Sequence, residues 1–204
     1  MILYADDYMV VADKPSGLLS VPGRGPDKQD CLVTRVQAEF PDVLTVHRLD
    51  MATSGLIVLG RGAEAQRRLS IAFSERRVEK RYAAVVAGTV DADTGEIDLP
   101  LITDWPNRPK QMIDHDIGKP SLTRFRVVGR GEGRTRMALE PVTGRSHQLR
   151  VHMMALGHPI LGDVFYAPPE IAAASERLLL HAEHLVVPHP DTGVNITFIS
   201  APSF

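Results

Sequence analysis

The chain has 204 residues, a formal net charge of -2 and a hydrophobic content of 44%. This length is typical of one globular domain, or of one domain with a narrow waist, and the apolar content is sufficient for a core. The near-neutral charge gives no global sign of nucleic-acid binding, so any basic surface must be local. Cys31 is the single cysteine, which excludes an intramolecular disulfide and favours a reducing compartment.

The N-terminus lacks the basic segment and the apolar run of a secretory signal. No window reaches the roughly 18 apolar residues that a membrane-spanning helix needs. We therefore expect a cytoplasmic protein that does not enter the membrane.

Apolar spacing and helix-stop residues predict the elements of the first half of the chain. Leu69, Ala72 and Phe73 repeat at helical steps, and Pro41 ends an earlier helical pattern. The predicted elements are a strand at 9–14, a helix at 32–40, a strand at 56–59, a helix at 63–76 and a strand at 81–86.

The second half begins with a long connection, residues 91–118, which contains Pro100, Pro106 and Pro109 and is expected to be irregular. The glycine-rich segment 129–133 predicts a hairpin between strands at 122–128 and 135–140. A helix is expected at 146–156, with Ser146 as its N-cap and Gly157 at its end. A final strand pair is expected at 178–187 and 194–199.

Strands outnumber helices in this order and do not alternate regularly with them. That pattern favours an α+β protein over a doubly wound fold.

Asp50 is the most informative residue, because it follows His47 and Arg48 and precedes small turn-forming residues and an apolar strand. One interpretation makes Asp50 a helix or turn cap, which is common for Asp in such a context. The other makes it a lone carboxylate nucleophile or base. Spacing alone favours the cap.

Two further residues have both a structural and a functional interpretation. Tyr82 opens an apolar strand and is either an aromatic residue at the core edge or a ring that stacks on a base. Arg150 shares a helix face with His147, so it either pairs with a carboxylate elsewhere or belongs to a solvated basic face.

No metal or nucleotide cofactor is expected. His147 and His152 are five residues apart, which does not suit a helical metal pair. His181 and His184 have odd spacing in a predicted strand, which places them on opposite faces. The glycine-rich segments lack the spacing of phosphate-binding loops.

Arginines are concentrated in two segments, residues 61–81 and 124–150, although the whole chain is slightly acidic. Arginine suits planar recognition of phosphates and base edges. The two clusters favour a focused RNA or DNA footprint, although a solvated helix face explains the first cluster almost as well.

Five segments together resemble the motifs of the RluA family of pseudouridine synthases, in the family's order. They are Asp13-Lys14-Pro15-Ser16-Gly17-Leu18, His47-Arg48-Leu49-Asp50 with Thr53-Ser54-Gly55-Leu56, Glu79-Lys80-Arg81-Tyr82, Thr143 to His152 with Gly157 to Asp163, and Leu178-Leu179-Leu180-His181-Ala182. The segment from Asp104 to Gln111 and the segment from Ser146 to Met153 resemble the member that modifies both transfer RNA and 23S rRNA.

The resemblance implies a pseudouridine synthase fold, which is a mixed, mostly antiparallel sheet with flanking helices and a central catalytic cleft. It implies one catalytic domain over residues 1–204 without the N-terminal S4 domain of many relatives. It further implies no cofactor, no obligate protein partner and a monomer.

The resemblance also implies a role for each matching residue. Asp50 would attack the target nucleoside, Arg150 would pair with Asp50 and orient it, and Tyr82 would stack on the uracil. Arg48 would fill the gap left by the flipped base. Leu180 would pack beside the base, although Leu178 and Leu179 are equally available.

The implied function is isomerisation of specific uridines in structured RNA: uridine 32 of a tRNA anticodon stem-loop, uridine 746 of 23S rRNA, or both. A non-catalytic RNA-binding module on the same fold is the alternative. A nucleoside or glycoside hydrolase that uses Asp50 would usually need a second carboxylate, and the segments around Asp50 and Arg150 supply none.

Overall fold

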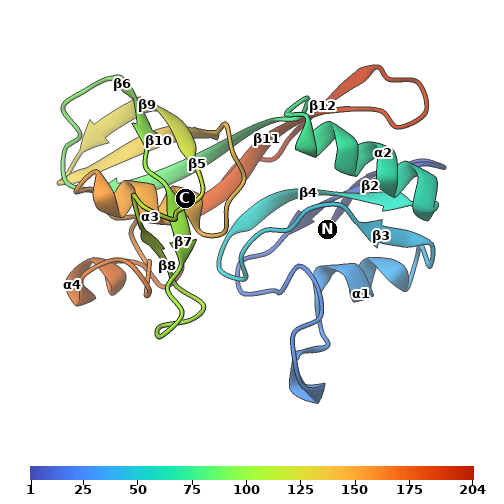
Figure 1. Cartoon of the computed structure of the whole chain (residues 1–204), viewed down its shortest axis with the longest axis horizontal. Coiled ribbons are helices and arrows are strands. Elements are labelled where there is room, and N and C mark those ends of the chain that lie inside the picture. The colour runs from blue at the N-terminus through green and yellow to red at the C-terminus, as the bar shows by residue number, and fades with distance from the viewer. The chain divides into compact units, whose positions relative to one another are not determined.

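The computed structural model describes residues 1–204, except for the side chain of Asp27. The chain divides into two compact units. Unit 1 contains Met1–Lys80 and Ala182–Ser203, and unit 2 contains Arg81–His181 and Phe204. The boundaries fall inside two strands, β5 (Glu79–Ala87) and β11 (Leu180–Pro188), and Figure 1 follows the chain through both units.

Unit 1 is built on a sheet with the strand order β1-β2-β4-β11, in which β3 also pairs with β4 and β12 with β11. Its strands other than β11 are β1 (Ile2–Ala5), β2 (Met9–Lys14), β3 (Val43–Thr45), β4 (Ser54–Arg61) and β12 (Asn195–Ile199). Its helices are η1 (Pro26–Lys28), α1 (Leu32–Gln37) and α2 (Gly62–Ser74).

The core of unit 1 forms where α2 packs on the sheet. The antiparallel register places Val11 opposite Val58. On the same face, Met9 and Val11 of β2 and Leu56 and Val58 of β4 are buried at every second position, which is the period of a strand. Leu69 and Ala72 of α2 pack against this face together with Leu185 of β11. The apolar positions predicted for the helix at 63–76 are therefore those that face the core.

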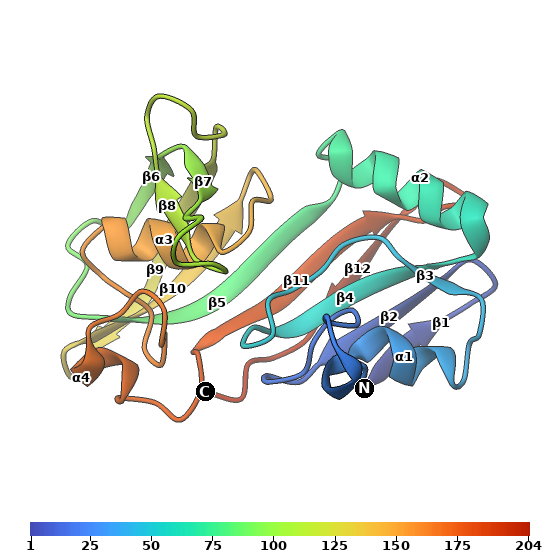
Figure 2. The same ribbon diagram turned by 60° about the horizontal axis from the view of Figure 1, so that its bottom comes forward.

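Unit 2 has a sheet with the strand order β5-β10-β9-β6 and a separate hairpin of β7 and β8. The strands that follow β5 are β6 (Thr94–Asp98), β7 (Leu101–Thr103), β8 (Gln111–Ile113), β9 (Leu122–Gly131) and β10 (Arg134–Pro141). The helices are α3 (Gln148–Ala155) and α4 (Pro169–Ala172). Helix α3 contacts β8, β9 and β10, as Figure 2 shows.

The turn between β9 and β10 consists of Glu132 and Gly133, which both have positive φ. Two such residues in succession give the type of tight turn whose twist matches that of antiparallel strands. The predicted hairpin is confirmed, with longer strands and a shorter turn than the glycines alone indicate.

The α+β class and most of the predicted elements are confirmed. The expectation for residues 91–118 is wrong, because this segment contains β6, β7 and β8. These strands have three to five residues. Strand β6 pairs with the distant β9, and β7 pairs with β8. Runs this short show no clear period in the sequence. No helix in the described part of the chain is long and apolar enough to cross a membrane.

Candidate active-site residues

Asp50 lies in the unit 1 loop that connects β3 to β4. Its neighbour Leu49 is buried, and both backbone polar groups of Leu49 pair with the Ser20 hydroxyl: the N–H donates at 3.0 Å and the carbonyl accepts at 2.7 Å. The Thr53 N–H donates to the Asp50 carbonyl at 3.1 Å and closes a turn. The element that follows is strand β4, so Asp50 does not cap a helix. Its side chain is half-buried.

Lys14 fixes the same loop from the end of β2. Its side chain is fully buried, and its ammonium donates to the carbonyls of Pro15, Leu18 and Met51 at 3.0, 2.7 and 3.0 Å. A buried cation is tolerated only when such partners replace water. Ser16 adds a hydrogen bond from its hydroxyl to the Ala52 carbonyl at 2.7 Å. The backbone on both sides of Asp50 is therefore held in place by residues 14–20.

Gly55 explains why this loop can enter β4 directly. Its φ is +112°, and a Cβ at this position would lie 2.4 Å from the Ala182 carbonyl oxygen of β11. Only glycine accepts both the positive φ and this close approach. Glycine is thus required at position 55, where β4 begins.

His47, in the same loop, contacts both β4 and α2. Its Nε2 accepts a hydrogen bond from the Val58 N–H at 3.1 Å, and its ring stacks on Phe73 with centroids 4.5 Å apart. Burial, followed by the nearby charge of Lys80, lowers the pKa of His47 from 6.5 to about 3. His47 is therefore neutral at physiological pH, with its proton on Nδ1. Arg48, the next residue, is exposed.

Acid is expected to destabilise the protein through His47. Between about pH 6.5 and pH 3 the unfolded chain protonates this residue and the folded chain does not, so stability falls as pH falls. The slope is at most about 1.4 kcal/mol per pH unit. Urea unfolding of the wild type and of His47→Gln, from about pH 7 to pH 4, measures it: the stability difference between the two proteins should shrink on acidification. Parallel profiles would contradict this role, since His152 and the other titrating groups are common to both proteins.

Arg150 lies in α3 of unit 2 and forms a buried ion pair with Asp163. Its Nε and Nη2 donate to the two carboxylate oxygens at 2.8 and 2.6 Å, and the two side chains are 3% and 1% exposed. The backbone N–H groups of Phe165 and Tyr166 also donate to Asp163, at 3.0 and 3.2 Å. The guanidinium lies 5.0 and 5.2 Å from the centroids of those two rings. The plane of the guanidinium is thus set by one carboxylate and two aromatic rings.

The expectation that Ser146 caps this helix is wrong. Helix α3 begins at Gln148, and its N-cap is His147 in the left-handed conformation, with φ of 54°. The Gln148 side chain explains the late start, because its Oε1 accepts from the Arg145 N–H and the Thr143 hydroxyl at 3.0 and 2.7 Å. These bonds hold the preceding turn in place of a serine cap. The helix ends at Ala155 with Leu156 as its C-cap, and Gly157, the predicted stop, follows with positive φ.

His147 nevertheless meets the same aromatic rings as Arg150. Its ring lies 5.8 Å from Phe165 and 5.6 Å from Tyr166 between centroids. The Tyr166 hydroxyl accepts from the Gln111 N–H at 2.8 Å and lies 2.6 Å from Nδ1 of His147. Tyr166 therefore connects strand β8 to the start of α3.

Tyr82 and Leu180 are the remaining predicted residues of unit 2. Tyr82 is half-buried in β5, opposite Leu139 of β10. Leu180 is the first residue of β11 and is 3% exposed; Leu178 is 2% exposed, whereas Leu179 between them is half-buried. Side chains of an extended segment point alternately to its two sides, so Leu178 and Leu180 share the buried side and Leu179 lies on the other.

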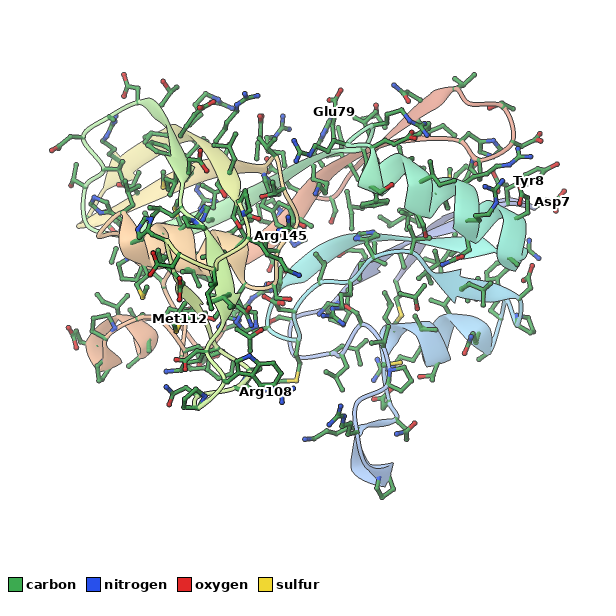
Figure 3. All side chains as sticks on the ribbon, in the orientation of Figure 1. Asp7, Tyr8, Glu79, Arg108, Met112 and Arg145 are labelled. Atoms are coloured by element: carbon green, nitrogen blue, oxygen red, sulfur yellow. The ribbon has the colours of Figure 1, made fainter. Side chains whose placement is uncertain are left out.

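Most of the clustered arginines form ion pairs. In the first cluster Arg61, Arg67, Arg68 and Arg77 pair with acidic side chains, and in the second Arg124, Arg130 and Arg134 do so. Such pairs cancel much of the local charge. Counting arginines in the sequence therefore overstates the basic surface, and Arg145, labelled in Figure 3, is an exposed member outside these pairs.

A family model described as RNA pseudouridylate synthase matches residues 8–155 of the chain. The chain belongs to this family. Its activity is an isomerisation on RNA, so the chain is an RNA pseudouridine synthase rather than a non-catalytic module on the same fold.

Relatives and solved structures agree with this assignment. The chain is 54% identical over 199 residues to the dual-specificity RNA pseudouridine synthase RluA of Yersinia pestis, with 97% of each chain covered. It is 53% identical over 205 residues to the protein of the same name from Escherichia coli K12, covering 100% of this chain and 94% of the relative. The structure of human RNA pseudouridylate synthase domain containing 1 is similar, with a TM-score of 0.83, 29% identity and coverage of 100% and 83%.

Sequence reasoning on this pseudouridine synthase missed the roles of Lys14 and Asp163. Both lie inside the motifs that carry the resemblance, Asp13 to Leu18 and Gly157 to Asp163. For Lys14 the available signal is its place at the end of an apolar strand, and for Asp163 its place between Gly162 and Val164, because a charged residue in such a setting is buried only with a partner. The partners are distant carbonyls and an arginine, which the sequence does not identify.

Proposed function

We propose that Asp50 is the catalytic nucleophile of this pseudouridine synthase. The observation that carries the proposal is the double anchoring of its loop: Ser20 holds the backbone of Leu49, and Lys14 holds the carbonyl of Met51. Both anchors act on the backbone, so they fix the position of Asp50 without using its carboxylate. Preorganisation of this kind is what a nucleophile requires.

The chemistry needs no cofactor. The N1–C1′ bond of uridine breaks as the Asp50 carboxylate bonds to the nucleoside, the uracil turns, and C5 joins C1′ while Asp50 is released again as a carboxylate. The hydrogen on C5 then leaves to solvent and N1 gains a proton, so atoms and charge balance without an oxidant or a second substrate. A carboxylate is sufficient as a covalent catalyst for such a step.

Four further residues have roles in the proposed reaction, by resemblance to the family. Tyr82 stacks on the uracil, Leu180 packs beside it, and Arg150 pairs with Asp50 to orient it. Arg48 occupies the gap in the RNA after base flipping, and its exposed position suits this role. The two units act as one catalytic domain.

The proposed substrates are structured RNAs: uridine 32 of a tRNA anticodon stem-loop and uridine 746 of 23S rRNA. The dual specificity in the printed names of relatives at 53–54% identity supports this choice. Flipping a base out of such RNA costs a few kcal/mol, and stacking at about 1–3 kcal/mol per base offsets it. The enzyme acts as a monomer in the cytoplasm.

Tritium release from C5-labelled uridine tests the function directly. The wild-type protein should release tritium from a tRNA anticodon stem-loop and from a 23S rRNA fragment that contains the target uridine. Release from only one RNA would narrow the substrate proposal to that RNA. Binding of both RNAs without release would overturn the proposed activity on these substrates.

A further inference from the structure

Trp105 is the only tryptophan in the chain, and its side chain is 66% exposed. It lies in the loop that connects β7 to β8, and the labelled Arg108 marks the end of this hairpin in Figure 3. A large ring left in solvent is unusual, since tryptophan normally buries most of its surface. Tryptophan is enriched at binding surfaces, where a single ring can anchor a ligand or partner.

The loop that presents Trp105 is ordered by its own hydrogen bonds. Asp104 donates from its N–H to the Lys110 carbonyl at 3.0 Å, and Lys110 donates to the Asn107 carbonyl at 3.1 Å. The Asn107 N–H donates to the Asp104 carbonyl at 3.1 Å. At the base of the loop, the Gln111 N–H donates to the Tyr166 hydroxyl. The indole is therefore held on a preorganised support, which lowers the entropy cost of binding.

The charge beside the indole is positive. The Arg108 guanidinium lies 4.5 Å from the centroid of the Trp105 ring. The acidic residue of the loop, Asp104, is engaged by the Asn107 side-chain amide at 3.1 and 2.9 Å. An aromatic ring next to an arginine is the pairing that binds a nucleobase and its phosphate together.

A single indole surrounded by polar loop residues suits one flat ligand better than a broad apolar partner surface. Protein interfaces need a contiguous patch with several anchors. A base needs only one ring to stack on and a cation for the phosphate. Since the protein acts on RNA, an unpaired nucleotide of its own substrate is the ligand of matching chemistry.

We propose that Trp105 and Arg108 form a base-stacking site for an unpaired nucleotide of the RNA substrate, separate from the uridine that is isomerised. The indole stacks on the base, and Arg108 contacts a neighbouring phosphate. The inference relies on the proposed function only for its RNA substrates. It assigns a substrate-binding role to the β7–β8 hairpin.

The single tryptophan makes the test direct, because all tryptophan fluorescence comes from Trp105. The probe is a tRNA anticodon stem-loop, bound to Asp50→Asn protein so that turnover is prevented. Binding should quench the emission and protect the indole from acrylamide. Emission and acrylamide accessibility that stay unchanged in a complex shown to form by filter binding would overturn the proposal.

Kinetics provide a second measurement on the active protein. Trp105→Ala should raise the KM for the stem-loop about 5- to 150-fold, the equivalent of the loss of one stacked base, with little change in kcat. Trp105→Phe should recover part of this loss. Ile117→Ala is the matched control, since Ile117 is also exposed, at 70%, and should leave KM unchanged.

The outcomes separate this site from the proposed activity. An absence of tritium release by the wild-type protein would reject the proposed activity. Tryptophan fluorescence would still show whether the bound RNA contacts Trp105. Normal release with unchanged KM in Trp105→Ala would reject the stacking site alone.

Discussion

Asp50→Asn is expected to abolish tritium release from C5-labelled uridine, with a loss of at least about 1000-fold in kcat. Asparagine has the shape of aspartate but lacks the anionic oxygen that attacks the nucleoside. The fold should persist, because the hydrogen bonds that hold the loop through the backbone of Leu49 and Met51 are unchanged in this variant. RNA affinity should remain close to that of the wild type.

The control is Asp7→Asn, which removes an exposed carboxylate of the same unit, labelled in Figure 3. This variant should release tritium at the wild-type rate. Equal release by Asp50→Asn and the wild type would reject Asp50 as the nucleophile, and the thermal midpoint of each variant shows that loss of activity is not loss of fold.

Asp163→Ala is expected to cost about 3–5 kcal/mol in the free energy of unfolding, because it leaves the Arg150 cation buried without its carboxylate. Asp163 holds Arg150 with two bonds of 2.8 and 2.6 Å, and both side chains are almost fully buried. The same change removes the acceptor for the N–H groups of Phe165 and Tyr166. Urea unfolding measures the loss.

The matched control is Asp93→Ala, since Asp93 also pairs with an arginine, Arg130 at 2.7 Å, but is 85% exposed. An exposed pair contributes about 0–1 kcal/mol. Similar losses of unfolding free energy in the two variants would show that burial does not make the Arg150–Asp163 pair more stabilising than an exposed pair.

Asp163→Asn keeps the shape of the side chain and separates positioning from folding. If Arg150 orients Asp50, this variant should lower kcat more than it changes KM at a temperature where it is fully folded. An unchanged kcat would show that Asp163 stabilises unit 2 without positioning Arg150 for catalysis.

Local patterns predicted much of the fold. The helical spacing of Leu69 and Ala72 predicted the buried face of α2, and the glycines at 129–133 predicted the β9–β10 hairpin. These features depend on neighbours in the chain, so periodicity and turn chemistry reveal them. Strand β6 escaped prediction because pairing with the distant β9 stabilises it. Strands β7 and β8 pair with each other, but each is too short to show a period in the sequence.

For the candidate site, too, the sequence indicated some features and the tertiary structure decided others. Asp50, Tyr82 and Arg150 stand out from the sequence through the motifs around them, and those motifs also predicted the family. The support of these residues is decided by the tertiary structure: Lys14 and Ser20 anchor the Asp50 loop, and Asp163 fixes Arg150. Whether a side chain is a carboxylate, a cation or an aromatic ring follows directly from the sequence. Which backbone carbonyl or carboxylate holds that side chain in position depends on packing between segments that are distant in the sequence. Local sequence patterns therefore do not predict it.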